Sequence, residues 1–367
     1  SALEKSGVIK NGLVFTLYVK YKNYNELKSG YYNLQKSMSV EDIIKELQKG
    51  GTPEPQEVTL ANLTIPEGYT LEQIATIINC PFVGDSTFPV LGMNEIHVVE
   101  QGDIVFVDHP KYYDKALQSK ATIVLINKEV PCPEGKALLI SDDPFRDFNK
   151  LTQFFKPFEK AVAQVSPTAK IGQHTVIQPG AFVGNHVEIG DHCLIHANVT
   201  IYDGCKIGNH VTIHAGTTLG ADAFYYKKRP EGFDKLLSGG RVVIEDHVDL
   251  GALCTIDRGV TGDTTIKQGT KIDNHVHIGH DTVVGQECLI ASQVGIAGCV
   301  VIEDRVTLWG QVGITSGVTI GEKAVILAQS GVTKSLEGNQ TYFGSPAEEA
   351  RKKYKELASV RSLAEKR

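Results

Sequence analysis

The sequence contains little that would place it in a membrane or give it a disulfide framework. Its 367 residues include no run approaching about eighteen apolar residues, the length of a transmembrane helix, and no signal-peptide pattern at the start. Its seven cysteines are an odd number, and no two have CxxC spacing. The formal net charge of −6 argues against general binding to nucleic acid. A cytoplasmic location with structural thiols is therefore expected, rather than disulfides or metal ligands.

A six-residue period dominates the second half of the chain. An aliphatic residue recurs at every sixth position in three stretches, which run Val165–Leu219, Ile244–Ile256 and Ile266–Val332. An amphipathic helix would need spacings of three and four, so the period predicts short strands joined by tight turns. A second inward residue four positions later should be small, and cysteines recur there at positions 193, 205, 254 and 288. Three hexapeptides then form one triangular coil of about eighteen residues, and stacked coils share a core.

The rest of the chain divides around this repeat. Residues 1–68 lack the period, 69–163 are expected to form a small α/β domain, 164–340 the coils, and 341–367 a basic helical extension. Two interruptions of the period, about Ala221–Arg241 and Arg258–Thr265, are predicted to be loops expelled from the coils. Such insertions often build the binding face of a repeat fold.

One histidine has an unusual phase in the repeat. Six others lie three positions after the aliphatic residue, an outward turn position: His174, His186, His192, His210, His247 and His275. His280 instead lies two positions after Ile278, and Gly298 should stack beside it one coil later. A neutral imidazole can accept a proton, and a glycine N–H can stabilise an oxyanion, which are the parts that acyl transfer requires. An isolated surface histidine is the alternative. Asp273 would either orient a substrate or cap a turn.

From about Tyr69 onward the chain resembles the UDP-3-O-acylglucosamine N-acyltransferases of lipid A biosynthesis. The matching segments are Ile104–Tyr112, Gly220–Phe224, Thr255–Gly259, Lys271–Asn274 and Asp273–Asp281. The resemblance implies a mainly β protein with a left-handed parallel β-helix, assembled as a homotrimer. It also implies transfer of a 3-hydroxyacyl chain from the phosphopantetheine thioester of acyl carrier protein to the amine of UDP-3-O-acylglucosamine. No bound cofactor and no metal are expected.

The resemblance also assigns residue roles. It implies that His280 is the general base, that the Gly298 N–H is the oxyanion donor, and that Asp273 binds the glucosamine. The residues implied to bind the uridine nucleotide are Phe106 and Tyr112, which sandwich the uracil ring, and Lys111 near them. For Phe106, which lies in an alternating apolar strand, core packing is the other interpretation.

The chain departs from the family pattern at several positions. His109 replaces an asparagine and His277 a glutamine, and both are counted here with the substrate-binding residues. His275 replaces a second glutamine, and Asp281 an asparagine. A second family histidine, near the carrier's pantetheine arm, is missing close to Gly317.

The first segment resembles a different family. Leu27–Leu34, followed by the capped amphipathic stretch Ser39–Leu47, resembles the LysM-like module of endolytic murein transglycosylases, and Leu63–Leu71 resembles the passage towards their catalytic domain. That catalytic domain is not found, so no glycan cleavage is expected. The segment is interpreted as a fusion or as a recruited module, and it is expected to be dispensable for acyl transfer.

The residues are also compatible with three other functions. One is a coenzyme A-dependent sugar acetyltransferase on the same coil. Another is a γ-type carbonic anhydrase, for which His275 and His280 have suitable spacing but Gly239 stands where another zinc-binding histidine is needed. The third is a weakly active or inactive paralogue that binds a nucleotide sugar, an alternative suggested by the missing histidine near Gly317.

Overall fold

The computed structural model describes residues 63–64, 69–96 and 98–365. These belong to a compact unit that begins at Ala61. The predicted LysM-like module lies outside the described residues. Within the described part of the chain, no helix combines the length and the apolar character needed to cross a bilayer.

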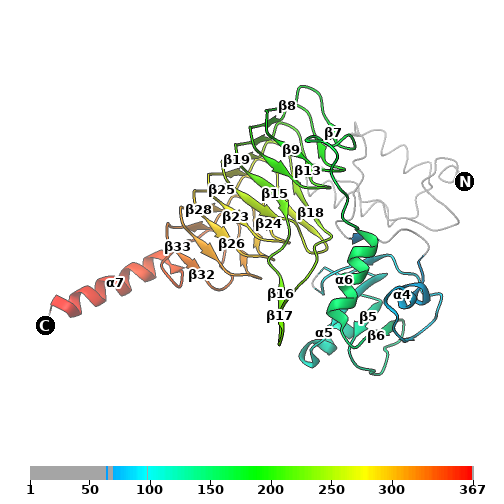
Figure 1. The fold of residues 1–367 in the computed structure, drawn as a ribbon. Helices are drawn as coiled ribbons and strands as arrows, with labels where there is room; N and C mark the ends of the chain where they lie inside the picture. The colour runs from blue at the N-terminus through cyan, green and yellow to red at the C-terminus, as the bar shows by residue number, and fades with distance from the viewer. Residues whose placement is uncertain (1–62, 65–68, 97, 366–367) are drawn as a thin grey trace, which may run out of the picture. The chain divides into compact units, whose positions relative to one another are not determined.

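A small α/β domain precedes the coils (Figure 1). Its six-stranded sheet has the order β1-β3-β4-β5-β6-β2, with β3 to β6 parallel and the two edge strands antiparallel to their neighbours. The strands are β1 (Leu63–Thr64), β2 (Phe82–Val83), β3 (Gly92–Met93), β4 (Asp103–Val107), β5 (Ile123–Ile126) and β6 (Ala137–Ile140). The helices are α4 (Leu71–Ile78), η1 (Pro110–Tyr112), α5 (Tyr113–Leu117) and α6 (Pro144–Phe155).

Local signals explain where the two longer helices of this domain begin. Thr70 caps α4 and forms a capping box with Gln73, and the Asp143 carboxylate caps α6 by accepting from the Arg146 N–H. Both helices contribute to one apolar cluster with alternate residues of the sheet, whereas α5 packs with the residues between them. The helices thus cover both faces of a largely parallel sheet.

The repeat forms three sheets of parallel strands, one for each side of the coil, although the last strand of the second sheet runs antiparallel to its neighbour (Figure 1). The first contains β7 (Lys170–Ile171), β10 (Glu188–Ile189), β13 (Lys206–Ile207), β18 (Arg241–Ile244), β21 (Asp263–Ile266), β24 (Val283–Val284), β27 (Val301–Ile302) and β30 (Thr319–Ile320). The second contains β8 (Val176–Ile177), β11 (Leu194–Ile195), β14 (Thr212–Ile213), β19 (Asp249–Leu250), β22 (Lys271–Ile272), β25 (Leu289–Ile290), β28 (Thr307–Leu308), β31 (Val325–Ile326), β33 (Thr341–Phe343) and β34 (Glu348–Glu349). The third contains β9 (Phe182–Val183), β12 (Thr200–Ile201), β15 (Thr218–Ala221), β20 (Thr255–Asp257), β23 (His277–Ile278), β26 (Gly295–Ile296), β29 (Gly313–Ile314) and β32 (Gly331–Val332).

The coil core follows the predicted pattern. Ile278 pairs with Ile296 and Ile296 with Ile314, so equivalent residues stack at intervals of one coil. The recurrent cysteines, at 193, 205, 254 and 288, are buried free thiols in the same cluster. The parallel β-helix and the interpretation of these cysteines as structural thiols are confirmed. Each coil buries only a few side chains, so stability comes from stacking coils into one continuous core.

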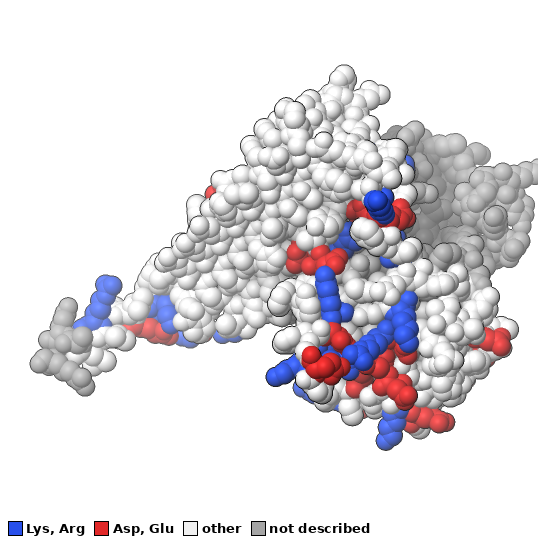
Figure 2. All heavy atoms as spheres, viewed as in Figure 1, with Lys and Arg blue, Asp and Glu red and all other residues white. Residues whose placement is uncertain are grey.

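Both interruptions of the period are more ordered than the predicted loops. The first contains a hairpin, β16 (Tyr226–Arg229) and β17 (Gly232–Lys235), and the second ends in strand β21. Charged side chains gather over the hairpin and the α/β domain (Figure 2). Arg146 of α6 bonds Asp234 at 2.8 Å, and Arg229 bonds Asp143 at 2.9 Å. These ion pairs join the hairpin to the α/β domain, which a prediction based on the repeat alone could not anticipate.

The chain ends in helix α7 (Ala350–Glu365), which extends away from the coils (Figure 1). Most of its side chains are exposed, including Tyr354, Leu357, Val360 and Leu363. Most of its basic residues therefore face solvent in this single chain.

Candidate active site

The turn residues of the coils explain why His280 differs from the other histidines. The six histidines three positions after the aliphatic residue are all exposed, and each has a φ between 55° and 61°. Four of them stack in one ladder along a corner, with ring centroids 4.9–5.0 Å apart: His174, His192, His210 and His247. Their prediction as outward turn residues is confirmed. His280 lies one position earlier in its turn, and its side chain is only 13% exposed.

A buried carboxylate holds the imidazole of His280. Nδ1 of His280 lies 2.9 Å from Oδ2 of Asp281, whose side chain is 5% exposed. The same Oδ2 accepts from the Val260 N–H at 2.8 Å, and the Asp281 N–H donates to Oγ1 of Thr264 at 2.8 Å. Since Nδ1 is occupied, Nε2 is the nitrogen left for a substrate. Both residues that support Asp281, Val260 and Thr264, lie in the second interruption of the repeat.

Gly298 lies directly against the imidazole, one coil after His280. A Cβ placed on Gly298 would be only 2.5 Å from Nε2 of His280, so no larger residue fits without moving the ring. At the same place in other turns, after strands of the first sheet, the N–H of Gln173, Asn209 or Gln286 donates to an aspartate in the next coil. The Gly298 N–H has no such partner among the described residues. It is therefore available to a ligand beside Nε2.

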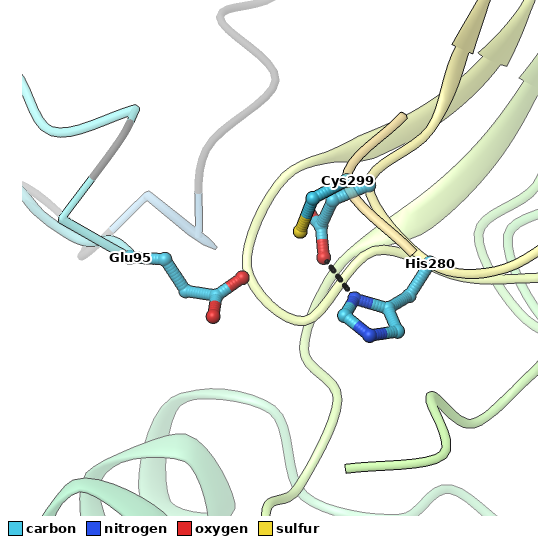
Figure 3. A group of neighbouring side chains, drawn as sticks. Glu95, His280 and Cys299 are labelled. Atoms are coloured by element: carbon cyan, nitrogen blue, oxygen red, sulfur yellow. Dashed lines mark hydrogen bonds and ion pairs between the residues drawn. The ribbon is translucent and has the colours of Figure 1, made fainter. Parts of the chain in front are cut away.

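Three further side chains border the site. Glu95, in the loop after β3, enters from the α/β domain, and Cys299 follows Gly298 on the adjacent coil (Figure 3). The Glu95 N–H donates to Oγ1 of Thr261 at 3.3 Å, and Oε2 of Glu95 is buried with no hydrogen-bond partner. The ring of Tyr225 meets that of His280 edge-on, with centroids 6.1 Å apart. Both interruptions and the α/β domain therefore close over one corner of the coil.

Neighbouring charges and burial shift the pKa values of two side chains at this corner, His280 and Glu95. Burial lowers the pKa of His280, but hydrogen bonds to Asp281 and Cys299 outweigh burial and raise it to about 10. Burial, together with the charge of Asp281, raises the pKa of Glu95 to about 8. Both shifts favour the protonated forms of the His280 imidazole and of the Glu95 carboxyl.

Two other predicted residues, His277 and Asp273, bond groups other than His280. His277 is on β23, with Nδ1 2.8 Å from Oγ1 of Thr255 and Nε2 3.9 Å from the largely buried carboxylate of Asp257. Asp273 follows β22 in a different sheet, where its exposed carboxylate accepts from the Asn274 N–H at 2.7 Å. In a single chain Asp273 thus caps a turn, and its carboxylate bonds Asn274 rather than His280.

The residues predicted to bind uridine divide into two environments. Phe106 of β4 is half-buried, and its ring packs against Phe148 of α6 at a centroid distance of 4.8 Å. His109 accepts from the Lys111 N–H at 3.2 Å and caps η1. Lys111 Nζ lies 5.5 Å from the ring centroid of Tyr112, which is 48% exposed. His109, Lys111 and Tyr112 therefore form an accessible group, whereas Phe106 also belongs to the domain core.

Comparison with known proteins places this site in a family. A UDP-3-O-acylglucosamine N-acyltransferase from Lawsonia intracellularis is 44% identical over 236 residues, which span 58% of this chain and 68% of the relative. The chain belongs to the UDP-3-O-acylglucosamine N-acyltransferase family. The predicted membership in an acyltransferase family is confirmed. Models for "Bacterial transferase hexapeptide (six repeats)" match residues 168–203, 186–221 and 263–298, and one for "Hexapeptide repeat of succinyl-transferase" matches 299–333, in agreement with the predicted left-handed β-helix.

The beginning of this acyltransferase-family chain matches a second family. The model of the YceG-like family matches residues 1–121, and an endolytic murein transglycosylase from Streptococcus pneumoniae is 69% identical over 78 residues. The predicted resemblance is confirmed, although the chain spans only 14% of that relative. Among solved structures, a UDP-N-acetylglucosamine acyltransferase from Bacteroides fragilis is 26% identical, with a TM-score of 0.47, over 52% of this chain and 73% of that one.

Sequence reasoning missed part of the site. Cys299 could have been found, because it lies eighteen residues after Asp281 at the same turn position, as the repeat requires. Asp281 was noticed only as a departure from the family pattern, not as the partner of His280. No local signal marked Glu95, whose approach depends on how the α/β domain packs against the coils.

Proposed function

We propose that the chain transfers a 3-hydroxyacyl group from acyl carrier protein to the 2-amine of UDP-3-O-acylglucosamine. The observation that carries this proposal is the His280 imidazole, which is anchored by Asp281 on one edge and lies against Gly298 on the other, where the Gly298 N–H has no partner among the described residues. Membership in the family supports the choice of substrate class. Together these features supply a base and an oxyanion donor on neighbouring coils.

The proposed reaction assigns each residue one task. The amine nitrogen attacks the thioester carbonyl while Nε2 of unprotonated His280 accepts the amine proton. The Gly298 N–H hydrogen-bonds the oxyanion of the tetrahedral intermediate. When the C–S bond breaks, the proton on His280 passes to the departing thiolate, so the products are an amide and the carrier thiol. Asp281 stays hydrogen-bonded to Nδ1 and stabilises the imidazolium formed in between.

The accessible group His109, Lys111 and Tyr112 is proposed to bind the uridine diphosphate. A cation beside an exposed aromatic ring suits a phosphate next to a planar base. Phe106 is proposed to complete the uracil contact from the half-buried side. His277 and Asp273 are proposed to contact the sugar, with Asp273 reaching the site of another subunit if the chain forms the predicted homotrimer.

Helix α7 is proposed as the docking surface for the acyl carrier protein. Its exposed basic residues include Arg351, Lys352, Lys355 and Arg361. Acyl carrier proteins are acidic, so complementary charge would accelerate their encounter with this helix. A trimer would bring three such helices to one end of the assembly.

The deciding experiment is to measure amide formation from UDP-3-O-acylglucosamine and 3-hydroxyacyl carrier protein by mass spectrometry, over several chain lengths. The expected result is one acylated product whose formation is lost in folded His280→Ala. Absence of product with every chain length, while the nucleotide sugar still binds, would overturn the proposal in favour of a binding paralogue. Product formed equally well from acyl-coenzyme A would instead assign a coenzyme A-dependent enzyme.

A further inference from the structure

Four side chains of three donor types converge at the corner occupied by His280. They are Glu95, His280, Asp281 and Cys299, and one ligand atom from each lies within 4.8 Å of the others. Figure 3 shows Glu95 pointing towards His280 and Cys299 from the opposite side of the site. Such a mixture of imidazole nitrogen, thiolate sulfur and carboxylate oxygen is the donor set that zinc prefers in proteins.

The fold explains why this corner, which follows strands of the third sheet, differs from the corner of the histidine ladder, which follows strands of the first. Asp281 and Cys299 occupy the turn position, with φ of 56° and 60°, that exposed histidines occupy in the ladder. Here the second interruption and the loop containing Glu95 cover the corner, so Asp281 is 5% exposed and Cys299 only half-exposed. The corner thus combines regular stacking of two coils with a carboxylate supplied from outside the coils.

Glu95 is the least satisfied member of the group. Its Oε2 is buried and accepts no hydrogen bond. Leaving a buried carboxyl oxygen without a partner is unfavourable, so the arrangement favours a ligand that this oxygen can bind. A cation held among the four donors would bind this oxygen directly.

We propose that Glu95, His280, Asp281 and Cys299 form a Zn²⁺ site whose occupation inhibits acyl transfer. Zinc bonds of about 2.0–2.3 Å place tetrahedral ligands roughly 3.3–3.8 Å apart. The present separations, of at most 4.8 Å, require the donors to move together by about an ångström. Nδ1 of His280 and Oδ2 of Asp281, 2.9 Å apart, already lie close to such a separation.

Acyl transfer would be inhibited because the zinc ion binds Nδ1 of His280. An ion on Nδ1 replaces the hydrogen bond to Asp281 and leaves the hydrogen of the neutral ring on Nε2, which then has no lone pair to accept the amine proton. The inhibitory effect rests on the proposed role of His280 in acyl transfer. Binding of the ion does not, because it depends only on the four donors.

The test uses the full chain, freed of metal with a chelator, and measures binding before activity. Zn²⁺ is titrated against a competing chromophoric chelator, and Co²⁺ is added as a spectroscopic probe. We expect one tight site per chain and a thiolate-to-cobalt charge-transfer band in the near ultraviolet. Cys299→Ser should abolish the band, and Glu95→Gln should weaken Zn²⁺ binding by at least about tenfold, the lower range for loss even of an outer-shell partner.

Matched variants separate this site from other metal-binding groups. Cys132→Ser removes another half-buried free thiol, and Glu100→Gln removes an exposed carboxylate of the same domain. His192→Asn interrupts the stacked histidine ladder. All three should keep the tight site and the cobalt band. No tight site in the wild type, or binding lost with His192→Asn but retained in Cys299→Ser, would overturn the proposal.

Activity is then measured with and without zinc. Zn²⁺ should inhibit wild-type amide formation at one ion per chain, a chelator should restore it, and Cys132→Ser should be inhibited like the wild type. Tight binding with the cobalt band but no effect on amide formation would contradict the inhibitory role. If the wild type shows no transfer at all, the binding and cobalt results still decide whether the metal site exists.

Discussion

Nδ1 of His280 and Oδ2 of Asp281 lie 2.9 Å apart although the two residues are adjacent in the chain. Neighbouring side chains in an extended strand point in opposite directions, and they meet here because the turn at Asp281 has a φ of 56°. The left-handed turn thus sets the direction in which Nε2 faces. This relationship leads to the first two predictions.

His280→Ala should lower kcat by about 10²–10⁴-fold, the usual contribution of a general base, with little change in Tm. The ring is not part of the apolar core, so its loss should not unfold the coils. The measurement is amide formation at saturating substrates, with thermal unfolding followed in parallel. His210→Ala, which removes an exposed ladder histidine, serves as the control. Equal effects of the two substitutions would contradict the assignment.

Asp281→Asn should change the pH dependence of transfer as well as its rate. The pKa of His280 is raised to about 10, so the unprotonated base becomes more abundant as pH rises towards that value, and kcat/KM should rise with pH. Removing the carboxylate removes a cause of the raised pKa. The rising limb of the profile should therefore move to lower pH, while the maximal rate falls because the ring is less well held. An unshifted profile would show that Asp281 does not act through His280.

Gly298→Ala should lower kcat by about 10²-fold or more, the cost typical of disturbing an oxyanion donor. The new methyl group would stand 2.5 Å from Nε2 of His280 and displace the ring. Gly313→Ala is the matched control, because a Cβ there meets nothing within 4 Å. Full activity of Gly298→Ala would mean that neither the ring nor the N–H needs its present position. Rates should be compared at saturating substrates.

Alanine substitutions of Phe106 and Tyr112 should have different effects, one on protein stability and the other on substrate binding. Tyr112→Ala removes a 48% exposed ring and should raise KM for the nucleotide sugar without lowering Tm. Phe106→Ala leaves a gap beside Phe148 and should destabilise the domain by about 2–3 kcal/mol, below the usual cost for a fully buried phenylalanine. Thermal unfolding and substrate titration measure the two effects. A lowered Tm in Tyr112→Ala would contradict its assignment to the accessible surface.

Two deletions should show at which residue the part of the chain needed for acyl transfer begins. Removal of residues 1–60 is expected to leave transfer and Tm unchanged, because the compact unit begins at Ala61. Removal of residues 1–68 also removes β1, which pairs with β3 at Leu63–Met93 and Thr64–Gly92. The longer deletion should lower the stability of the α/β domain by about 1–2 kcal/mol through lost edge hydrogen bonds. Loss of activity in the shorter deletion, with the fold intact, would show that the first segment takes part.

The sequence predicted the coils well because their structure repeats a local rule. Parallel strands in register bond to equivalent residues of the next coil, so the period gives both the inward residues and the stacking of Gly298 beside His280. It was less informative where the period is interrupted. The hairpin β16–β17 became ordered through ion pairs such as Arg146–Asp234, between residues far apart in the chain.

The tertiary structure alone decided how the corner around His280 is closed. Glu95 reaches it from another domain, and the two interruptions of the repeat supply Tyr225 and Val260. The environment of Phe106 likewise depends on tertiary structure, because its ring packs against helix α6. The sequence by itself determined the repeat, the unusual phase of His280 and the small residue beside it, since these follow from hydrogen bonding at a constant spacing. The burial, the charge state and the donor set of the site come from segments brought together only by packing, which no local period encodes.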